Sequence, residues 1–284
     1  MKFLVQVLDY FASRYLAYRG ALHLRLGYPS IAAFAFDHIG HEINIKGRYE
    51  AADLAATFKF LGKRALVAGI AVDVGANIGN HSLYFSEHFE QVVSLEPNPR
   101  VFELLCFNVK LRGNIQPFNI GASDTGGEMA LSFSPGNWGG GQLVGGSQDQ
   151  SNTFSVTVKR LDELDALASR SVGLIKIDVE GHELPVLKGA IKLLLRSRPG
   201  ILFEQQPADI AQGSSAVVDW LKSNGYDQFY EVQSFPGLPK GWTFPGRKVI
   251  NGLMRVVAGE RKSVVPIGRF EKAFYPMIIA LQAS

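Results

Sequence analysis

One segment constrains the fold more than any other. Residues 71–79 read Ala-Val-Asp-Val-Gly-Ala-Asn-Ile-Gly, an apolar run through Asp73 that is followed by Gly75 and Gly79. An apolar run, a glycine turn and then a helical pattern are typical of the first strand, turn and helix of a doubly wound α/β sheet. Glycine lets a ligand approach the backbone, and a helix N-terminus supplies free N–H groups. The segment therefore predicts a nucleoside site.

The glycine spacing in this turn distinguishes a nucleoside that carries a pyrophosphate from one that carries no phosphate. A pyrophosphate cradle needs Gly-x-Gly-x-x-Gly after the strand. Here the order is Gly75-Ala76-Asn77-Ile78-Gly79, so the middle glycine is absent. An acid such as Asp73 is also poorly placed beside a pyrophosphate, whereas it suits a cationic amine or sulfonium. The turn favours a nucleoside without phosphate, and a purely structural turn is the alternative.

A second acid strengthens this prediction. Residues 91–97, Gln-Val-Val-Ser-Leu-Glu-Pro, read as a short apolar strand that ends at Glu96. Glu96 follows Gly75 by 21 residues, close to the separation of about 20 expected for an acid that binds ribose hydroxyls in this topology. A carboxylate accepts two hydrogen bonds from a vicinal diol. We expect Glu96 to hold a ribose; the alternative is a solvated acid at a strand end.

Strand and helix patterns alternate along the middle of the chain. Strands are expected at 71–76, 91–97, 115–122, 172–179 and 200–205, with helices over 79–88, 100–111 and 184–196. This alternation predicts a parallel sheet with right-handed crossovers, and late strands at 229–232 and 276–281 suit a terminal antiparallel pair. We therefore predict an α/β fold with a doubly wound, mostly parallel, seven-stranded sheet.

The chain divides into an extension and a main domain. Residues 1–62 are expected to form an N-terminal extension, helical over 1–28 and a hairpin over 31–48. Residues 63–284 are expected to form the nucleoside-binding domain, with a loop-rich insertion near 234–271. A glycine-rich segment over 134–147 contains Trp138, which either stacks on a sugar ring or packs as an ordinary loop residue. His81 and His88 are interpreted as helix-surface residues.

The strand at 172–179 ends in a cluster of ionisable residues, at the sheet edge where ligands of open α/β sheets bind. Three interpretations remain open. In the first, Asp178 and Glu180 contact a substrate, and His182 or a carboxylate takes its proton. In the second, which we favour less, Asp178, Glu180 and Glu204 hold Mg²⁺. In the third, Glu183 caps the next helix and His182 is a surface residue.

The bulk properties exclude several classes of protein. Of 284 residues, 46% are hydrophobic and 19% are charged, which indicates a globular chain. A net charge of +3 does not indicate a nucleic-acid partner. The single cysteine, Cys106, excludes an internal disulfide, and no Cys/His cluster has zinc spacing. These features favour a cytoplasmic protein without a resident metal.

The first 28 residues are apolar but carry charges throughout. Asp9, Arg14, Arg19 and Arg25 interrupt the run, so no stretch approaches the ~20 apolar residues of a membrane span. We expect a helix with a narrow polar face. Four roles are open for this helix: it docks on its own domain, covers a bound substrate, forms a dimer contact or lies at a membrane surface. These alternatives stay open, as does the oligomeric state.

Five segments, taken in order, resemble the FkbM family of S-adenosylmethionine (SAM)-dependent methyltransferases, and the turn at 73–79 alone resembles the first motif of class I methyltransferases. They are Val72–Asn80, Leu95–Pro99, Asn119–Asp124, Leu161-Asp162, and Ile175–Leu184 with Lys188-Gly189-Ala190. The likeness runs from about residue 46 to about Glu204. It implies a class I methyltransferase sheet, SAM as cofactor and a small-molecule or glycan acceptor. By resemblance, members are mostly O-methyltransferases acting on hydroxyls of sugars, glycolipids and secondary metabolites.

The resemblance also implies roles for residues at the strand ends. The turn should meet the methionine part of SAM, with Asp73 at its amine, directly or through water. Glu96 should take the ribose diol with help from Asn98. The expected cofactor-binding residues are Asp73, Gly75, Ala76, Asn77, Gly79, Glu96, Asn98, Gly121, Ala122 and Ser123, the last three beside adenine. The expected catalytic residues are Asp178, Glu180 and His182, with His182 as general base.

Two other functions remain open. A nicotinamide-dependent oxidoreductase would use a related sheet, although the absent middle glycine counts against it. A non-catalytic module would keep the nucleoside site and transfer nothing. A measurement of SAM binding distinguishes a methyltransferase from the oxidoreductase, and a methyl-transfer assay distinguishes it from the non-catalytic module.

Overall fold

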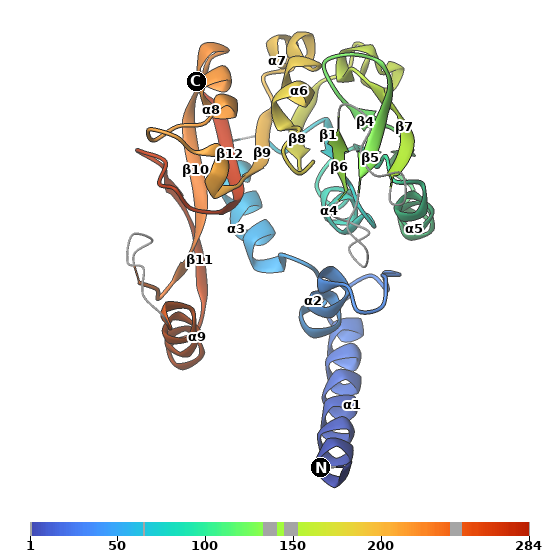
Figure 1. The fold of residues 1–284 in the computed structure, drawn as a ribbon, viewed down its shortest axis with the longest axis vertical. Helices are drawn as coiled ribbons and strands as arrows, with labels where there is room; N and C mark the ends of the chain where they lie inside the picture. The colour runs from blue at the N-terminus through green and yellow to red at the C-terminus, as the bar shows by residue number, and fades with distance from the viewer. Residues whose placement is uncertain (1, 65, 133–140, 145–152, 239–245, 284) are drawn as a thin grey trace.

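The computed structural model describes residues 2–64, 66–132, 141–144, 153–238 and 246–283. Within these residues the centre is an eight-stranded sheet of order β11-β10-β12-β9-β8-β1-β2-β3 (Figure 1). Its strands are β1 (Ile70–Val74), β2 (Gln91–Leu95), β3 (Ile115–Phe118), β8 (Val172–Ile177), β9 (Gly200–Gln205), β10 (Tyr226–Phe235), β11 (Arg261–Pro266) and β12 (Tyr275–Gln282).

The sheet has a parallel half and an antiparallel half. The pairs β1–β2, β2–β3, β1–β8 and β8–β9 are parallel, whereas β12 pairs antiparallel with both β9 and β10. The chain winds outward from β1 to β3 and then returns to β8 on the other side of β1. This reversal leaves a crevice at the carboxyl ends of β1 and β8. The predicted doubly wound α/β sheet of class I methyltransferase type is confirmed.

Helices cover both faces of the sheet because successive strand residues point to opposite sides. On one face, α3 (Ala51–Gly62) and α4 (Asn80–Phe85) pack against alternate residues such as Ala71 and Leu174. On the other, α6 (Glu183–Lys188), α7 (Ile191–Ser197) and α8 (Ala216–Ser223) pack against Val72 and Ile175. Helix α5 (Pro99–Val109) packs through Leu105 beneath the β1–α4 turn. Residues of α3 thus share one core with the strands.

A second, four-stranded sheet lies beside the crevice, with order β4-β7-β5-β6. It comprises β4 (Gly121–Ala122), β5 (Gly127–Ser132), β6 (Gln142–Val144) and β7 (Thr153–Lys159). The strand expected over 115–122 is divided between the two sheets. The Asn119 amide donates to the carbonyl oxygens of Glu96 at 2.8 Å and Pro97 at 3.1 Å, which turns the chain out of the main sheet. Trp138 and most of segment 134–147 lie outside the described residues.

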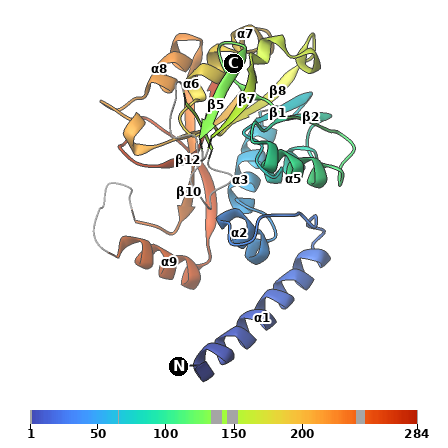
Figure 2. The ribbon, with the colours of Figure 1, turned by 45° about the vertical axis from the view of Figure 1, so that its right-hand side comes forward.

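The N-terminal extension is helical throughout its regular parts. Helix α1 (Lys2–Arg25) confirms the helix expected over 1–28 and projects from the body (Figure 2). The hairpin expected over 31–48 is wrong, because α2 (His38–Lys46) occupies that segment. Gly40 makes a close contact instead of a turn, since a Cβ there would lie 2.9 Å from the Phe34 carbonyl oxygen. In the described part of the chain, no helix combines enough length and apolar character to cross a bilayer.

The insertion expected to be loop-rich contains regular structure. Helix α9 (Arg247–Ala258) is followed by β11, which pairs antiparallel with the long strand β10. This pairing gives the sheet eight strands where seven were expected. The helix expected over 184–196 is divided at Gly189 and Ala190 into α6 and α7. Gly189 packs closely at this point, since a Cβ there would lie 2.0 Å from the Ser123 carbonyl oxygen.

Candidate active site

A pocket opens at the carboxyl ends of β1 and β2, beside the reversal of strand order. It encloses about 820 Å³, including the solvent space at its mouth, which lies within the range of small-molecule sites. Its walls come from the β1–α4 turn, the end of β2, the second sheet and the segment after β8. The expected cofactor-binding residues that line it are Gly75, Ala76, Asn77, Glu96, Asn98, Gly121 and Ala122.

The β1–α4 turn is compact because its residues adopt left-handed backbone conformations. Gly75, Asn77 and Gly79 have φ of 74°, 51° and 90°, a region that favours glycine and asparagine. A Cβ on Gly75 would lie 1.9 Å from the carbonyl oxygen of Asp178, so only glycine lets the ends of β1 and β8 meet. Gly79 stands outside the lining and begins α4, where a Cβ would crowd Leu105 at 2.8 Å.

Glu96 presents a buried carboxylate to the pocket. It is 8% exposed, and each oxygen accepts one backbone N–H, from Asn77 to Oε2 at 3.0 Å and from Asn98 to Oε1 at 2.8 Å. A carboxylate oxygen accepts a second hydrogen bond, which leaves capacity for a vicinal diol. Burial raises the pKa of Glu96 to about 7, against the opposing effect of the two backbone donors and Lys176. The Asn98 side chain caps α5 and fixes this corner.

Asp73 lies behind the pocket and not in its lining. It is 0% exposed, accepts a hydrogen bond from Ser82 Oγ at 2.6 Å, and its Oδ1 lies 3.3 Å from Lys176 Nζ. Asp73 therefore exposes no surface with which to make the direct contact with the cofactor amine that was one expectation from the sequence. A contact through water stays a prediction. In this structure, Asp73 anchors Lys176.

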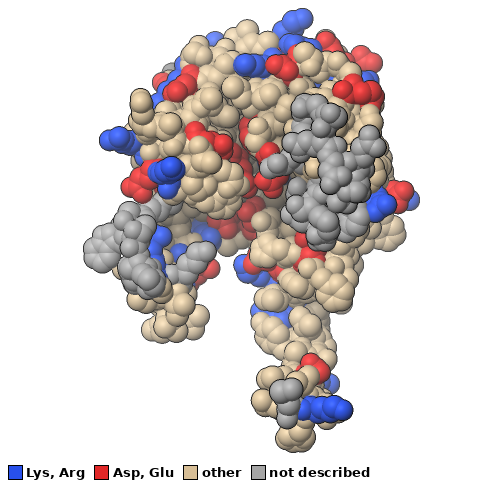
Figure 3. Space-filling model, viewed as in Figure 1, with Lys and Arg blue, Asp and Glu red and all other residues tan. Residues whose placement is uncertain are grey.

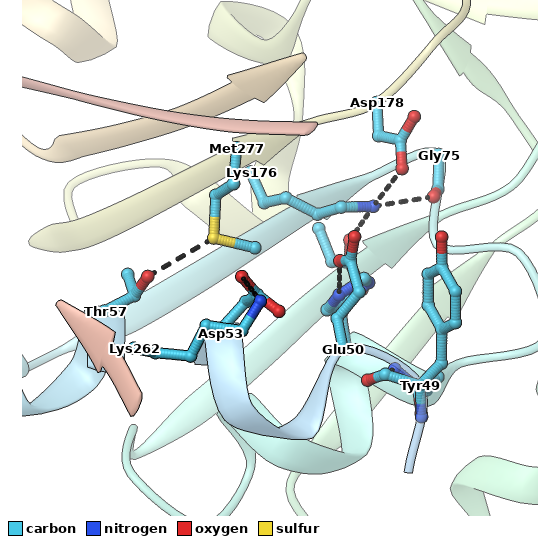
Figure 4. A network of polar contacts seen from close by, with 12 residues as sticks. Tyr49, Glu50, Asp53, Thr57, Gly75, Lys176, Asp178, Lys262 and Met277 are labelled. Carbon is cyan, nitrogen blue, oxygen red and sulfur yellow. Dashed lines mark hydrogen bonds and ion pairs between the residues drawn. The ribbon is translucent and has the colours of Figure 1, made fainter. Parts of the chain in front are cut away.

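Lys176 joins the two strand ends that flank the crevice. Its Nζ lies 3.3 Å from Asp73 Oδ1 and 3.2 Å from Asp178 Oδ2, and it donates to the Gly75 carbonyl oxygen at 3.2 Å (Figure 4). Burial lowers the pKa of Lys176, but the attraction of the two carboxylates outweighs burial and holds that pKa above its usual value. A charged lysine therefore fixes the position of Asp178 at the pocket wall.

The second sheet supplies an apolar wall. Gly121 and Ala122 of β4 line the pocket together with Leu131 of β5 and Leu143 of β6. An apolar wall of this kind suits a flat base. Ser123, the third residue expected beside adenine, lies outside the lining, and its Oγ is 2.9 Å from His182 Nε2.

Two of the three expected catalytic residues reach the pocket. Asp178 and Glu180 line it, whereas His182 does not. Glu180 and Gly181 have φ of 50° and 93°, and this reversal turns His182 toward Ser123. Burial lowers the pKa of His182, with Asp124 opposing. The structure thus places the residue expected to be the general base outside the pocket lining.

A smaller hollow adjoins the pocket and contains residues that the sequence analysis did not assign. Tyr49 lines both spaces and points toward Gly75 (Figure 4). Glu50 lines the hollow, and its Oε2 lies 3.1 Å from Nε2 of His81. His81, expected at a helix surface, is buried and lines the pocket, so that expectation is wrong. Tyr49 and Glu50 lie at the start of the segment that resembles the FkbM family, but they precede the first strand by 20 residues or more and were assigned no role.

The hollow is strongly acidic. Asp178 and Glu204 line it beside Glu50, and Figure 3 shows acidic side chains gathered in a depression at the centre of this face. Burial, followed by repulsion from Asp178 and Glu180, raises the pKa of Glu204 to about 8. Burial and Asp178 also raise the pKa of Glu180. Carboxylates with raised pKa values are stronger bases than ordinary ones.

The donor set of the pocket fits SAM better than a dinucleotide. Glu96 can take a ribose diol, the second sheet can cover a base, and the turn offers close backbone approach. Among the described residues of the lining, Lys176 is the only lysine or arginine, and two carboxylates already neutralise it. A pyrophosphate would therefore face carboxylates without a free cation. Within the described residues, no group of three or more His, Cys, Asp or Glu is arranged to hold a metal ion.

The chain is similar to known methyltransferases over part of its length. The chain is 34% identical to the hexuronic acid methyltransferase AglP of Haloferax volcanii over 43% of this chain and 50% of that protein. It is 27% identical to the methyltransferase sdnD of Sordaria araneosa over 58% of this chain and 73% of that protein. The matched segment thus spans half the length of the Haloferax relative.

Solved structures show more distant likenesses. The methyltransferase FkbM of Methylobacillus flagellatus is 22% identical, over 48% of this chain and 32% of that chain, with a TM-score of 0.34. The precorrin-6y C5,15-methyltransferase of Geobacter metallireducens is 14% identical over 81% of this chain and 88% of that chain, with a TM-score of 0.41. The model of the methyltransferase FkbM domain matches residues 73–227, more than half of the 284 residues, and the chain therefore belongs to the FkbM methyltransferase family.

Proposed function

We propose that this chain is a SAM-dependent O-methyltransferase that acts on a hydroxyl of a sugar-like acceptor. The observation that carries the proposal is the adjacency of two spaces. One presents the buried Glu96 carboxylate and an apolar wall, and the other presents the carboxylates of Glu50, Asp178 and Glu204, of which Glu204 has a raised pKa. Asp178 lines both spaces, so a group held in one reaches a group held in the other.

The first space supports cofactor binding by residues of this chain. Glu96 accepts hydrogen bonds from the ribose hydroxyls, and Gly121 and Ala122 lie against the base. Gly75 and Asn77 bring the turn close to the methionine part. When bound, SAM supplies an electrophilic methyl group on a positively charged sulfur, which keeps the electron pair of the broken bond.

The second space supports acceptor binding and removal of a proton. The residues must hold the acceptor oxygen about 3 Å from the methyl carbon, opposite the sulfur, which is chiefly a positioning task. Tyr49, whose pKa burial and Glu50 raise, keeps its hydroxyl proton and can donate to the acceptor. Glu204 of the hollow or Glu180 of the adjoining pocket accepts the proton that the acceptor hydroxyl loses. These carboxylates replace His182 as the proposed bases, because His182 lies outside the pocket lining.

The charge of the hollow bears on the acceptor. The Haloferax relative is named for a hexuronic acid, which carries a carboxylate. In this chain Glu50, Asp178 and Glu204 line the hollow, and Lys176, which also lines it, is already paired with Asp73 and Asp178. A further carboxylate placed there would therefore lie beside acidic residues without a free cation to pair with. Carboxylates do accept hydrogen bonds from sugar hydroxyls. We therefore propose a neutral, hydroxyl-bearing ring as the part of the acceptor that enters the hollow.

Calorimetry and a transfer assay test the proposal. SAM and S-adenosylhomocysteine should both release heat on binding, and NAD should not. Labelled methyl from SAM should then reach neutral glycosides better than the matching uronic acid glycosides. The product should survive mild alkali, since an ether survives it and a methyl ester does not. Binding without transfer to any glycoside would favour the non-catalytic module, and NAD binding without SAM binding would favour the oxidoreductase.

A further inference from the structure

Helix α1 exposes a continuous apolar stripe. Leu4, Leu8, Phe11, Tyr15 and Tyr18 recur at intervals of four, three, four and three residues, so they lie along one side of the helix. Each is between 50% and 64% exposed, and the helix projects away from the body (Figures 1 and 2). A stripe of large apolar side chains in water is costly, which indicates that a partner covers it.

Basic residues border this stripe. At 100° per residue, Arg14 lies on one side of the stripe and Arg19 on the other, while Asp9 lies on the far side of the helix. Lys2 and Arg25 add two further positive charges near the two ends. An apolar stripe with tyrosines and bordering arginines suits the boundary of an anionic bilayer, where rings enter the headgroup region and guanidinium groups reach phosphates.

The same charges disfavour a second copy of the chain as the partner. The stripe has the spacing of a coiled-coil seam, so Arg14 and Arg19 occupy the two flanking positions. In a parallel pair, Arg14 of one copy would face Arg19 of the other. In an antiparallel pair that overlaps over the whole stripe, Arg14 of one copy would face Arg14 of the other. Neither arrangement brings an acid to these arginines, since Asp9 lies on the far side.

Helix α9 also exposes an apolar face, because its polar side is the one that packs against the protein. Its polar side faces the protein, where Asn251 is 9% exposed and accepts the Leu238 N–H at 2.9 Å. Its apolar side faces outward. There, Val249, Leu253, Val256 and Val257 are between 60% and 86% exposed. This orientation is the reverse of an ordinary surface helix.

The two helices lie at the same end of the molecule, in both views of the ribbon (Figures 1 and 2). The acidic depression lies between and above them in the view of Figure 3. We propose that the apolar stripe of α1 and the outward face of α9 together dock this protein on the surface of an anionic lipid bilayer. The docking does not depend on the proposed methyl transfer.

Vesicle flotation with the full chain and without SAM tests the docking. The protein should float with phosphatidylcholine vesicles that contain about 30% phosphatidylglycerol, and more weakly with phosphatidylcholine alone. Replacing Arg14 or Arg19 by Gln should lower the partition coefficient roughly fivefold each. Phe11→Glu and Val256→Glu should abolish flotation. Leu195→Glu is the control, because Leu195 is equally exposed at 63% on the distant helix α7.

Two results would overturn the proposal. One is a wild-type protein that stays at the bottom of the gradient with anionic vesicles. The other is a wild-type protein that sediments as a dimer in solution and becomes monomeric through Phe11→Glu, which would identify a second copy as the partner. Equal circular-dichroism melting of wild type and variants shows that a loss of flotation is not a loss of folding. Phe11, Arg14 and Val256 are exposed, whereas Arg19 is half-buried and its guanidinium lies 3.2 Å from His23 Nε2.

Discussion

The protonation of Glu96 should control cofactor affinity between pH 5.5 and 8.5. The carboxyl has a pKa of about 7 in the free protein, and only its ionised form offers both oxygens as acceptors to a ribose diol. At about pH 5.5, roughly one molecule in 30 carries the ionised form. SAM affinity should therefore fall about 30-fold from pH 8.5 to pH 5.5, or by about 2 kcal/mol.

The matched variant is Glu96→Gln, which keeps the shape of the side chain. Its amide offers one acceptor where the carboxylate offers two, so its NH₂ group faces the N–H of Asn77 or Asn98. We expect Glu96→Gln to weaken SAM binding by about 1–3 kcal/mol at high pH and to remove most of the pH dependence. Glu103→Gln on the exposed side of α5 is the control.

Calorimetry of SAM binding at several pH values gives the ratio of wild-type to variant affinity. That ratio should shrink toward one as the pH falls through 7. A ratio that stays constant from pH 8.5 to 5.5 would refute the assignment of Glu96 to the ribose. Stability of the free protein should show the opposite sign. Because the folded pKa of Glu96 is raised, its contribution to the unfolding free energy is present below about pH 4.5 and is lost as the pH rises through 7.

Three further predictions concern the strand ends and the proposed bases. Gly75→Ala should cost about 3 kcal/mol or more in urea unfolding, since its Cβ would lie 1.9 Å from a carbonyl oxygen; Gly181→Ala, with open space but a similar φ, should cost only about 1 kcal/mol. Lys176→Met should lower the free energy of unfolding by about 3–5 kcal/mol, because it leaves a buried carboxylate unpaired. The control Lys46→Met, in an exposed pair, should change the free energy of unfolding by no more than about 0.5 kcal/mol. Equal losses in urea unfolding would contradict this prediction. Methyl transfer should rise with pH through about 8, as the base deprotonates, and Glu204→Gln should flatten that rise; an unchanged profile would remove Glu204 as the base.

Local chemistry explains which parts of the fold the sequence predicted. The β1 strand and its glycine turn were recognisable because a buried strand requires a run of apolar residues and a positive φ favours glycine. Both signals lie on residues that are adjacent in the sequence. Glu96 was recognisable because its distance along the chain from Gly75 is set by one strand–helix–strand unit. Alternation of such units predicts a parallel sheet. The hairpin over 31–48 failed because a glycine needed for close packing at position 40 has the same signature as a turn glycine.

Side-chain environments could not be predicted, because they depend on segments that are distant in sequence. Lys176 and Asp73 are 103 positions apart, yet their pairing buries Asp73 behind the pocket. His182 faces Ser123, which directly follows β4 of the second sheet. Nothing within a few residues of His182 indicates that contact.

Sequence patterns were enough to predict the class of sheet, the first turn and the acid at the end of the second strand, since each follows from spacing within one local unit. The folded arrangement was needed to see which carboxylates share the hollow, that Tyr49 and His81 line the pocket, and that α9 turns its apolar side outward. Those features depend on packing between elements that are distant in the sequence. A pattern along the chain does not show which face of a helix or strand packs against which other element.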